Sequence, residues 1–244
     1  EALGLTVPPQ TDRVEQPDLT GIDVYTDGTG DGIHAYGSNA GAWDLMYGSK
    51  PYEGNQAIRW SGAGAYGAIG FDFQPDRDLQ YLADQGYGLS LAIRGTSAVS
   101  GISIRFMDSD TEDPEDRPWR MGFELDDFDP SWDGAWNPVY IPLADLQEQG
   151  AWEDGEWFDA EGTFDWSAVD RLEISTGADG LGAAVLGLDD IRIAAVNSGA
   201  PKLARDTGAN GLFFDPATSG HGFDFNVVDA GMVIYYYGHT ASGE

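Results

Sequence analysis

The chain has 244 residues, of which 41% are hydrophobic, and its 8 Trp, 11 Tyr and 11 Phe supply a folded core and exclude a disordered chain. Its 42 acidic residues against 12 basic ones give a net charge of -30, which excludes general binding to nucleic acid or to an anionic membrane, since both need a basic surface. No run approaches the ~18 consecutive apolar residues of a membrane span. Zero cysteines exclude disulfides, thiol catalysis and Cys-ligated zinc.

Short strand patterns separated by turn residues fill most of the chain. Residues 1–17 carry three prolines and no periodicity, which predicts an extended leader. Residues 18–195 then form the main domain, with predicted strands at Gly21–Thr26, Gln56–Trp60, Ala68–Phe73, Gly88–Arg94, Gly101–Met107, Trp119–Leu125, Trp136–Ile141, Val169–Ser175 and Gly187–Ile193. Only Leu143–Gln149 indicates a helix. The pattern predicts an all-β fold, a two-sheet β-sandwich of the jelly-roll kind.

The composition changes after the predicted sandwich. Residues 196–209 lack apolar periodicity and hold Pro201 and one of only two lysines, which predicts a linker. Residues 210–244 then predict a partial β-hairpin unit, with a strand at Met232–Tyr237. Because about 35 residues of hairpin cannot hold a core alone, the unit is expected to be truncated or docked on the sandwich.

Four of the ten arginines, Arg59, Arg94, Arg105 and Arg120, fall inside predicted strands. The runs around the last three alternate with apolar residues, so these arginines face away from the core. If their strands are neighbours in one sheet, three guanidinium groups share an open surface that offers donors to hydroxyls or to a few carboxylates. The alternatives are that the strands lie in different sheets, or that the arginines form ordinary surface ion pairs. A neutral ligand is favoured over a polyanion, because the surrounding acids oppose a polyanion.

Aromatic side chains are the second resource for binding. Trp60, Trp119 and Trp136 are expected in the core, whereas the tryptophans at 43, 132, 152 and 157 lie in Gly- and Asp-rich stretches that predict loops. There they would either stack on sugar rings or cap the ends of the sandwich. The predicted ligand-binding residues are Arg94, Arg105, Arg120, Tyr36, Trp43 and Tyr66.

No catalytic motif is recognised. The predicted strands carry no alternating acids, the Gly-x-Ser-x-Gly motif is absent, and His34, His221 and His239 are too far apart in sequence for a metal triad. The acidic run at 108–116 lacks the glycine and the terminal glutamate of an EF-hand, and it predicts a solvated loop. A binding module is therefore favoured, with a structural or adhesive sandwich and a sandwich hydrolase or lyase as alternatives.

Five local sequences occur in the order found in a known family. They are Val24-Tyr25-Thr26-Asp27-Gly28, the segments 52–58, 89–95 and 136–143, and Leu188-Asp189-Asp190-Ile191-Arg192-Ile193. Over residues 18–195 the chain resembles the galactose-binding-like jelly-roll carbohydrate-binding modules of secreted polysaccharide-degrading enzymes. Residues 210–244 resemble the first half of a short repeat of secreted bacterial proteins, with a Gly-His-Gly-Phe-Asp core.

The resemblance implies a non-catalytic, monomeric module that binds a polysaccharide such as a β-glucan and is linked to a catalytic domain. It also implies secretion, and a chain that begins at Glu1 without Met fits a removed signal peptide. No affinity for nucleic acid or membranes is expected.

The resemblance further implies a structural calcium between the first strand, the loop before Gln56 and the last strand. The residue pattern agrees at one point, because alternation puts Asp189 on the same face as the buried isoleucines that follow it. Calcium takes oxygen ligands, and the implied set is Asp23 or Asp27, the carbonyl of Lys50, Glu53 and Asp189. The alternative is that Asp189 accepts backbone N–H bonds or pairs with an arginine.

Overall fold

The computed structural model describes residues 21–109, 117–128 and 130–195 completely, and it describes the backbone of three further strands between residues 211 and 237. The predicted leader (1–17) and linker (196–209) lie outside the described residues. The division of the chain into domains therefore stays a prediction.

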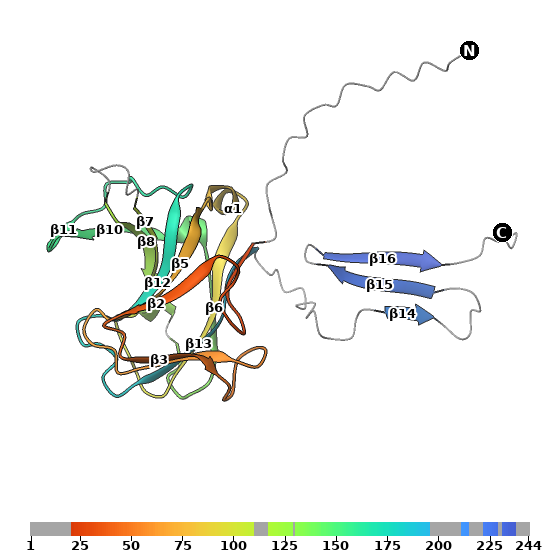
Figure 1. Ribbon diagram of the computed structural model, residues 1–244, viewed down its shortest axis with the longest axis horizontal. Coiled ribbons are helices and arrows are strands. Elements are labelled where there is room, and N and C mark those ends of the chain that lie inside the picture. Colours follow the sequence, from red (N-terminus) through yellow and green to blue (C-terminus); the bar gives the residue numbers. More distant parts are fainter. Residues whose placement is uncertain are drawn as a thin grey trace, which may run out of the picture.

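Two antiparallel sheets form a β-sandwich, which confirms the predicted all-β jelly-roll fold (Figure 1). Sheet I contains β1 (Ile22–Tyr25), β3 (Ala42–Tyr47), β4 (Ala57–Ser61), β6 (Tyr87–Gly95), β9 (Asn137–Pro142) and β13 (Val185–Ala195). Its order is β3-β4-β13-β6-β9, and β1 also pairs with β13. Sheet II contains β2 (Ile33–Ser38), β5 (Ala68–Arg77), β7 (Ser103–Asp108), β8 (Trp119–Glu124), β10 (Gln147–Glu153), β11 (Glu156–Phe158) and β12 (Val169–Ser175). Its order is β11-β10-β8-β7-β12-β5-β2.

The core lies between the two sheets and follows from strand alternation. In β5, Ile69, Phe71 and Phe73 are buried between the sheets, while Asp72 lies on the outer face. Trp60 is fully buried, and its indole Nε1 donates to the Ala40 carbonyl at 2.7 Å. Each large apolar side chain buried in this way stabilises the fold by about 1.5–3 kcal/mol.

All nine predicted strands are confirmed, but β2, β3, β10, β11 and the short helix α1 (Gln80–Asp84) were not predicted. The helix predicted at Leu143–Gln149 is wrong. Its first residues form a short 3-10 helix, η2 (Leu143–Asp145), and β10 begins at Gln147 because it pairs with β8. Pairing with a distant strand here outweighs the weak local helix preference.

The C-terminal strands β14 (Gly211–Phe214), β15 (Gly222–Val228) and β16 (Gly231–Tyr237) form one antiparallel three-stranded sheet of their own. The predicted hairpin is therefore part of a larger sheet, and the likeness to a bacterial repeat stays a prediction. Throughout the part of the chain that the structure describes, no helix has the length and hydropathy of a membrane span.

Candidate functional site

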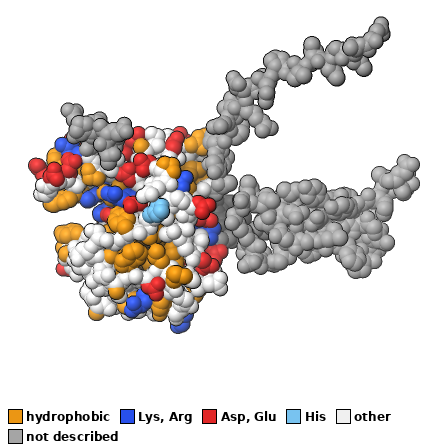
Figure 2. All heavy atoms as spheres, in the orientation of Figure 1, with side chains coloured by type: hydrophobic (Ala, Val, Ile, Leu, Met, Phe, Trp, Pro, Cys, Tyr) orange, Lys and Arg blue, Asp and Glu red, His pale blue; other side chains and the backbone are white. Residues whose placement is uncertain are grey.

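The outer face of sheet II carries a cluster of charged and aromatic side chains. Side chains in register across neighbouring strands project to the same side. One row consists of Tyr36, Gly70, Glu173, Arg105 and Gly122, on β2, β5, β12, β7 and β8. The next row consists of His34, Asp72, Arg171, Met107 and Arg120. We call these two rows the open face; Figure 2 shows Lys and Arg side chains gathered on this side of the molecule, in a hollow below the β10–β11 hairpin.

Glu173 is the centre of the first row and is buried. The Arg105 guanidinium forms an ion pair with one of its carboxylate oxygens, and the Tyr36 hydroxyl donates to the other at 2.8 Å. Burial alone would raise the pKa of Glu173, but the Arg105 charge and the Tyr36 hydrogen bond outweigh it and hold that pKa below its ordinary value. Burial and the neighbouring Glu173 charge raise the pKa of Tyr36, so its hydroxyl remains a donor at neutral pH.

Two glycines make room for this row. A Cβ atom at Gly70 would overlap the ring of Tyr36, and one at Gly122 would overlap the side chain of Arg105. Because Gly70 has no side chain, the Tyr36 ring lies close to the sheet and its hydroxyl reaches Glu173. At Gly122 the closest atom would be the Ile104 carbonyl oxygen, so this glycine lets β8 approach β7 closely.

Two guanidinium groups of the second row lack strong acceptors. The Nε of Arg120 is buried and has no hydrogen-bond partner, and its guanidinium lies 5.3 Å from the ring centroid of Trp157. Within the described ranges, the Nε of Arg171 donates to the Met107 thioether, at 3.3 Å, and a thioether is a weak acceptor. Among the described residues, neither arginine forms an ion pair with a carboxylate. Burial, followed by the charges of Arg105 and Arg171, lowers the pKa of Arg120 to about 10.

The β10–β11 hairpin adds two exposed indole rings beside Arg120. Trp152 and Trp157 are directly opposite each other and are 50% and 45% exposed. Gly150, two residues before Trp152, is the register partner of Arg120, so both rings project to the side of the open face. The site thus combines stacking surfaces with hydrogen-bond donors.

The structure brings together three of the predicted ligand-binding residues, Arg105, Arg120 and Tyr36. Arg94 does not share their sheet: it lies on β6 in sheet I, donates to the Ser49 carbonyl at 2.9 Å and stacks on Trp136 at 4.6 Å. Alternation shows which way a side chain points, but it does not show to which sheet its strand belongs. Consecutive strands β6 and β7 are in different sheets.

Trp43 and Tyr66 also lie outside the open face. Trp43 is on β3 in sheet I and packs against the core, whereas Tyr66 is 72% exposed in the connection between β4 and β5, at an end of the sandwich. Trp136 was expected in the core but is only partly buried, because it packs against Arg94 and Tyr52 near the surface.

Sequence reasoning missed Arg171 and Glu173, although their signal was present. Both alternate with Leu172 and Ile174 in the predicted strand at Val169–Ser175, which places them on the outer face. It also assigned Trp152 and Trp157 to loops, whereas both lie on strands.

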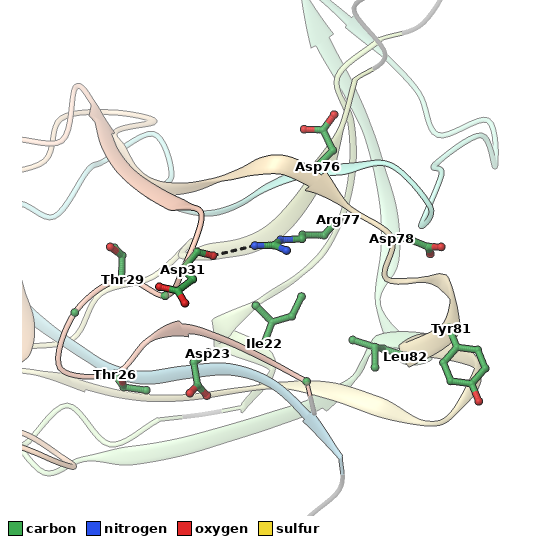
Figure 3. A pocket seen from close by; sticks show the side chains of 13 residues that line it. Ile22, Asp23, Thr26, Thr29, Asp31, Asp76, Arg77, Asp78, Tyr81 and Leu82 are labelled. Atoms are coloured by element: carbon green, nitrogen blue, oxygen red, sulfur yellow. Dashed lines mark hydrogen bonds between the residues drawn. The ribbon is translucent and has the colours of Figure 1, made fainter. Parts of the chain in front are cut away.

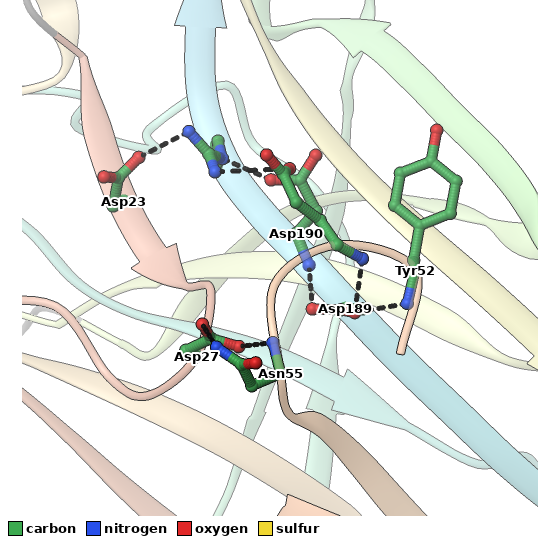
Figure 4. Close-up of polar contacts among 8 residues, drawn as sticks. Asp23, Asp27, Tyr52, Asn55, Asp189 and Asp190 are labelled. Atoms are coloured by element: carbon green, nitrogen blue, oxygen red, sulfur yellow. Dashed lines mark hydrogen bonds and ion pairs between the residues drawn. The ribbon is translucent and has the colours of Figure 1, made fainter. Parts of the chain in front are cut away.

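Asp189 and Asp27 hold the loop that precedes β4 (Figure 4). Asp189 is fully buried, as predicted, and accepts backbone N–H groups of Tyr52 at 2.7 Å, Glu53 at 3.1 Å and Asp190 at 2.8 Å. Asp27 accepts the N–H groups of Asn55 at 2.6 Å and Gln56 at 2.8 Å. This arrangement of Asp189 is the alternative to calcium binding stated above.

The other implied calcium ligands already have partners. Asp23 and Glu53 lie near the Arg192 guanidinium, and the Lys50 carbonyl accepts a hydrogen bond. The Arg192 guanidinium lies 3.4 Å from Asp23 and 3.5 Å from Glu53 and also pairs with Asp190, while the Lys50 carbonyl accepts from Trp136 Nε1 at 3.1 Å. Over the described ranges, no three acidic or histidine side chains converge as a metal site. A calcium ion would therefore have to replace N–H donors and Arg192, and calcium binding stays a prediction.

Chelation tests that prediction directly. If calcium holds the loop, excess chelator should lower the melting temperature by several degrees, because ~1 kcal/mol shifts a domain of this size by ~2–4 °C and a bound ion stabilises by mass action. The measurement is a thermal scan with and without chelator, paired with elemental analysis. An unchanged scan with no metal detected would leave the N–H bonds and Arg192 as the restraints on this loop.

A cleft of about 880 Å³ lies elsewhere, between β1, the turn after it and the start of α1 (Figure 3). Asp23, Asp31, Asp76 and Asp78 line it, and Arg77 Nη2 donates to the Asp31 carbonyl at 2.9 Å. No residue of the open face lines this cleft. Its acidic lining gives it a different character from the open face.

The fold is similar to the folds of solved carbohydrate-binding modules. The chain is similar to the family 11 carbohydrate-binding module of the cellulosomal cellulase Lic26A-Cel5E of Clostridium thermocellum, with 14% identity, a TM-score of 0.51, and coverage of 73% of this chain and 96% of that module. A Clostridium thermocellum family 11 module in complex with a β-1,3-1,4-mixed-linked tetrasaccharide gives 15% identity, coverage of 68% and 89%, and a TM-score of 0.47. A family 30 carbohydrate-binding module is 21% identical to this chain, with a TM-score of 0.49 and coverage of 64% of this chain and 76% of that module. No family model matches the sequence, and no curated protein does.

Proposed function

We propose that this chain is a carbohydrate-binding module that holds a polysaccharide on the open face without catalysing a reaction. The observation that carries the proposal is the exposed pair Trp152 and Trp157 beside the donors of Arg105, Arg120 and Arg171. Sugar rings offer C–H faces that stack on aromatic rings, and their hydroxyls accept hydrogen bonds from guanidinium groups. The fold shared with a family 11 module of a cellulase supports the same conclusion.

The state of Glu173 does not suit this residue to be the general acid of a glycosidase. A glycosidase acid must be protonated near neutral pH, which requires a raised pKa. The pKa of Glu173 is instead lowered, since Arg105 and Tyr36 outweigh its burial, so it remains an ion-pair partner. We propose a structural role for this carboxylate.

The remaining features that the sequence resemblance implies belong to the same proposal. The module would be secreted and monomeric, would be linked to a catalytic domain, and would contain a structural calcium. A neutral β-glucan is the first ligand to test.

Affinity electrophoresis tests binding. The native 244-residue chain should be retarded in gels that contain a polysaccharide, with mixed-linkage β-glucan and polygalacturonate as the first two probes. Trp157→Ala should weaken binding roughly tenfold, or ~1.4 kcal/mol, because a stacking surface is lost. The melting temperature should hardly change, since the ring is 45% exposed.

The matched control is Trp136→Ala, which removes an indole that stacks on an arginine of sheet I. It should bind like the wild type. No reducing sugar should be released in any sample. If a folded chain is retarded by no polysaccharide, the structural or adhesive alternative replaces this proposal.

A further inference from the structure

The positive charges of Arg120 and Arg171, which lie in register on either side of Met107, are not matched by carboxylates in contact with them among the described residues. Glu173 is already engaged by Arg105 and Tyr36, so it offers these two arginines no direct contact. Asp72 is the register partner of Arg171, but the two form no ion pair within the described chain. Among the residues that the structure describes, two positive charges therefore have no contacting carboxylate, although the protein carries a net charge of -30.

Both guanidinium groups are also partly removed from water. Arg120 is partly buried with an orphaned Nε, and Arg171 donates its Nε to a thioether. Met107 lies between them in register and is only 4% exposed. Desolvating a cation without a counter-charge is unfavourable, and a ligand that supplies the counter-charge offsets that cost.

An anion forms stronger hydrogen bonds with the Arg120 and Arg171 guanidinium groups than a hydroxyl does. A hydroxyl offers a dipole, whereas a carboxylate or a sulfate offers charge-assisted bonds that are about twice as strong and match the planar fork of arginine. Burial is the largest cause of the lowered pKa of Arg120; the Arg105 charge lowers that pKa further, the Glu173 charge opposes the shift, and the Arg171 charge adds to it.

We infer that the open face selects an acidic polysaccharide and holds a carboxylate or sulfate group of a sugar between Arg120 and Arg171, next to Trp157. The inference rests on the proposed function and names its ligand class. It reverses the preference for a neutral glucan that net charge alone favours, because exposed acids are screened within ~8 Å at physiological salt while a partly buried pair is screened much less.

The experiment compares acidic polymers with their neutral counterparts at ~0.15 M salt, where this screening applies. Affinity electrophoresis of the native chain would use alginate and polygalacturonate, each beside its carboxyl-reduced form, and a sulfated galactan beside its desulfated form. At least one acidic polymer should bind roughly tenfold or more tightly than its neutral counterpart. The carboxylate and sulfate arms identify which anion is preferred.

Variants locate the selectivity. Arg120→Gln and Arg171→Gln should each remove most of the preference for the acidic polymer, and Arg120→Lys should keep part of it because the charge remains without the planar fork. Arg94→Gln is the matched control, since Arg94 also stacks on a tryptophan but lies in sheet I, and it should bind like the wild type. Melting temperatures check that each variant is folded.

The outcomes distinguish a failure of the proposed polysaccharide binding from a failure of the acidic selectivity. If neutral polymers bind as tightly as acidic ones, the module function stands and the acidic selectivity is overturned. If the acidic preference survives in both glutamine variants, the assignment to Arg120 and Arg171 is wrong. If no polymer binds, both the function and the selectivity fall.

Discussion

Replacing Glu173 with alanine should lower the free energy of unfolding by about 3–5 kcal/mol, the usual loss when one partner of a buried ion pair is removed. The variant leaves the partly buried Arg105 guanidinium without its counter-charge and the Tyr36 hydroxyl without its acceptor. Urea unfolding at pH 7 measures the change. An Arg105→Met/Glu173→Leu double variant is the control, and it should recover much of the loss because both charges are removed together.

The Glu173→Ala variant should also change how the free energy of unfolding depends on pH below about pH 5. The pKa of Glu173 is lower in the folded chain than its ordinary value of 4.5, since Arg105 and Tyr36 outweigh the effect of burial. Its contribution is therefore complete above about pH 4.5 and is lost as the pH falls through the folded value. The stability gap between wild type and Glu173→Ala should narrow from pH 5 towards pH 3. A gap that stays constant over this range would contradict the charged ion pair.

Replacing Asp189 with alanine should lower the free energy of unfolding by a comparable amount, because Asp189 holds the loop before β4. Three backbone N–H groups lose their acceptor, those of Tyr52 and Glu53 in partly buried bonds and that of Asp190 in a buried one, and an unsatisfied buried donor costs about 1–3 kcal/mol. We expect a loss of about 3 kcal/mol or more in urea unfolding, with faster hydrogen exchange at Tyr52 and Glu53.

Asp189→Asn is the matched control for that loss. Burial raises the pKa of Asp189, which means that the folded state disfavours its charge, while an amide oxygen still accepts N–H bonds. Asparagine should therefore cost less than alanine, in chelator and without it. If alanine leaves stability within about 0.5 kcal/mol of the wild type, as an ordinary surface substitution would, the loop is not held by Asp189.

The sequence was informative wherever local alternation decides the structure. Alternation predicted the nine strands, the outward direction of Arg105 and Arg120, and the inward direction of Asp189. It could not separate Arg94 from Arg105, because the assignment of strands to sheets depends on pairings between distant segments.

The β10–β11 hairpin could also have been predicted from the sequence. The Asp154-Gly155 pair, with φ angles of 48° and 88°, forms the turn of the β10–β11 hairpin, and an Asp-Gly pair is a strong hairpin signal. By contrast, two of the three donors to Asp189, the N–H groups of Tyr52 and Glu53, come from residues 137 and 136 positions earlier in the chain. No local pattern connects those segments.

The strand order of sheet II also bears on which part of a polymer could contact the proposed site. Within the described sandwich, β2 is the last strand and no further strand pairs beyond it, so the rows that contain Tyr36 and His34 end at an open edge. A polymer that crosses the strands from Trp157 towards β2 would continue past this edge into solvent. Attachment would then require no chain terminus, and the number of binding positions would grow with polymer length rather than with the number of chain ends.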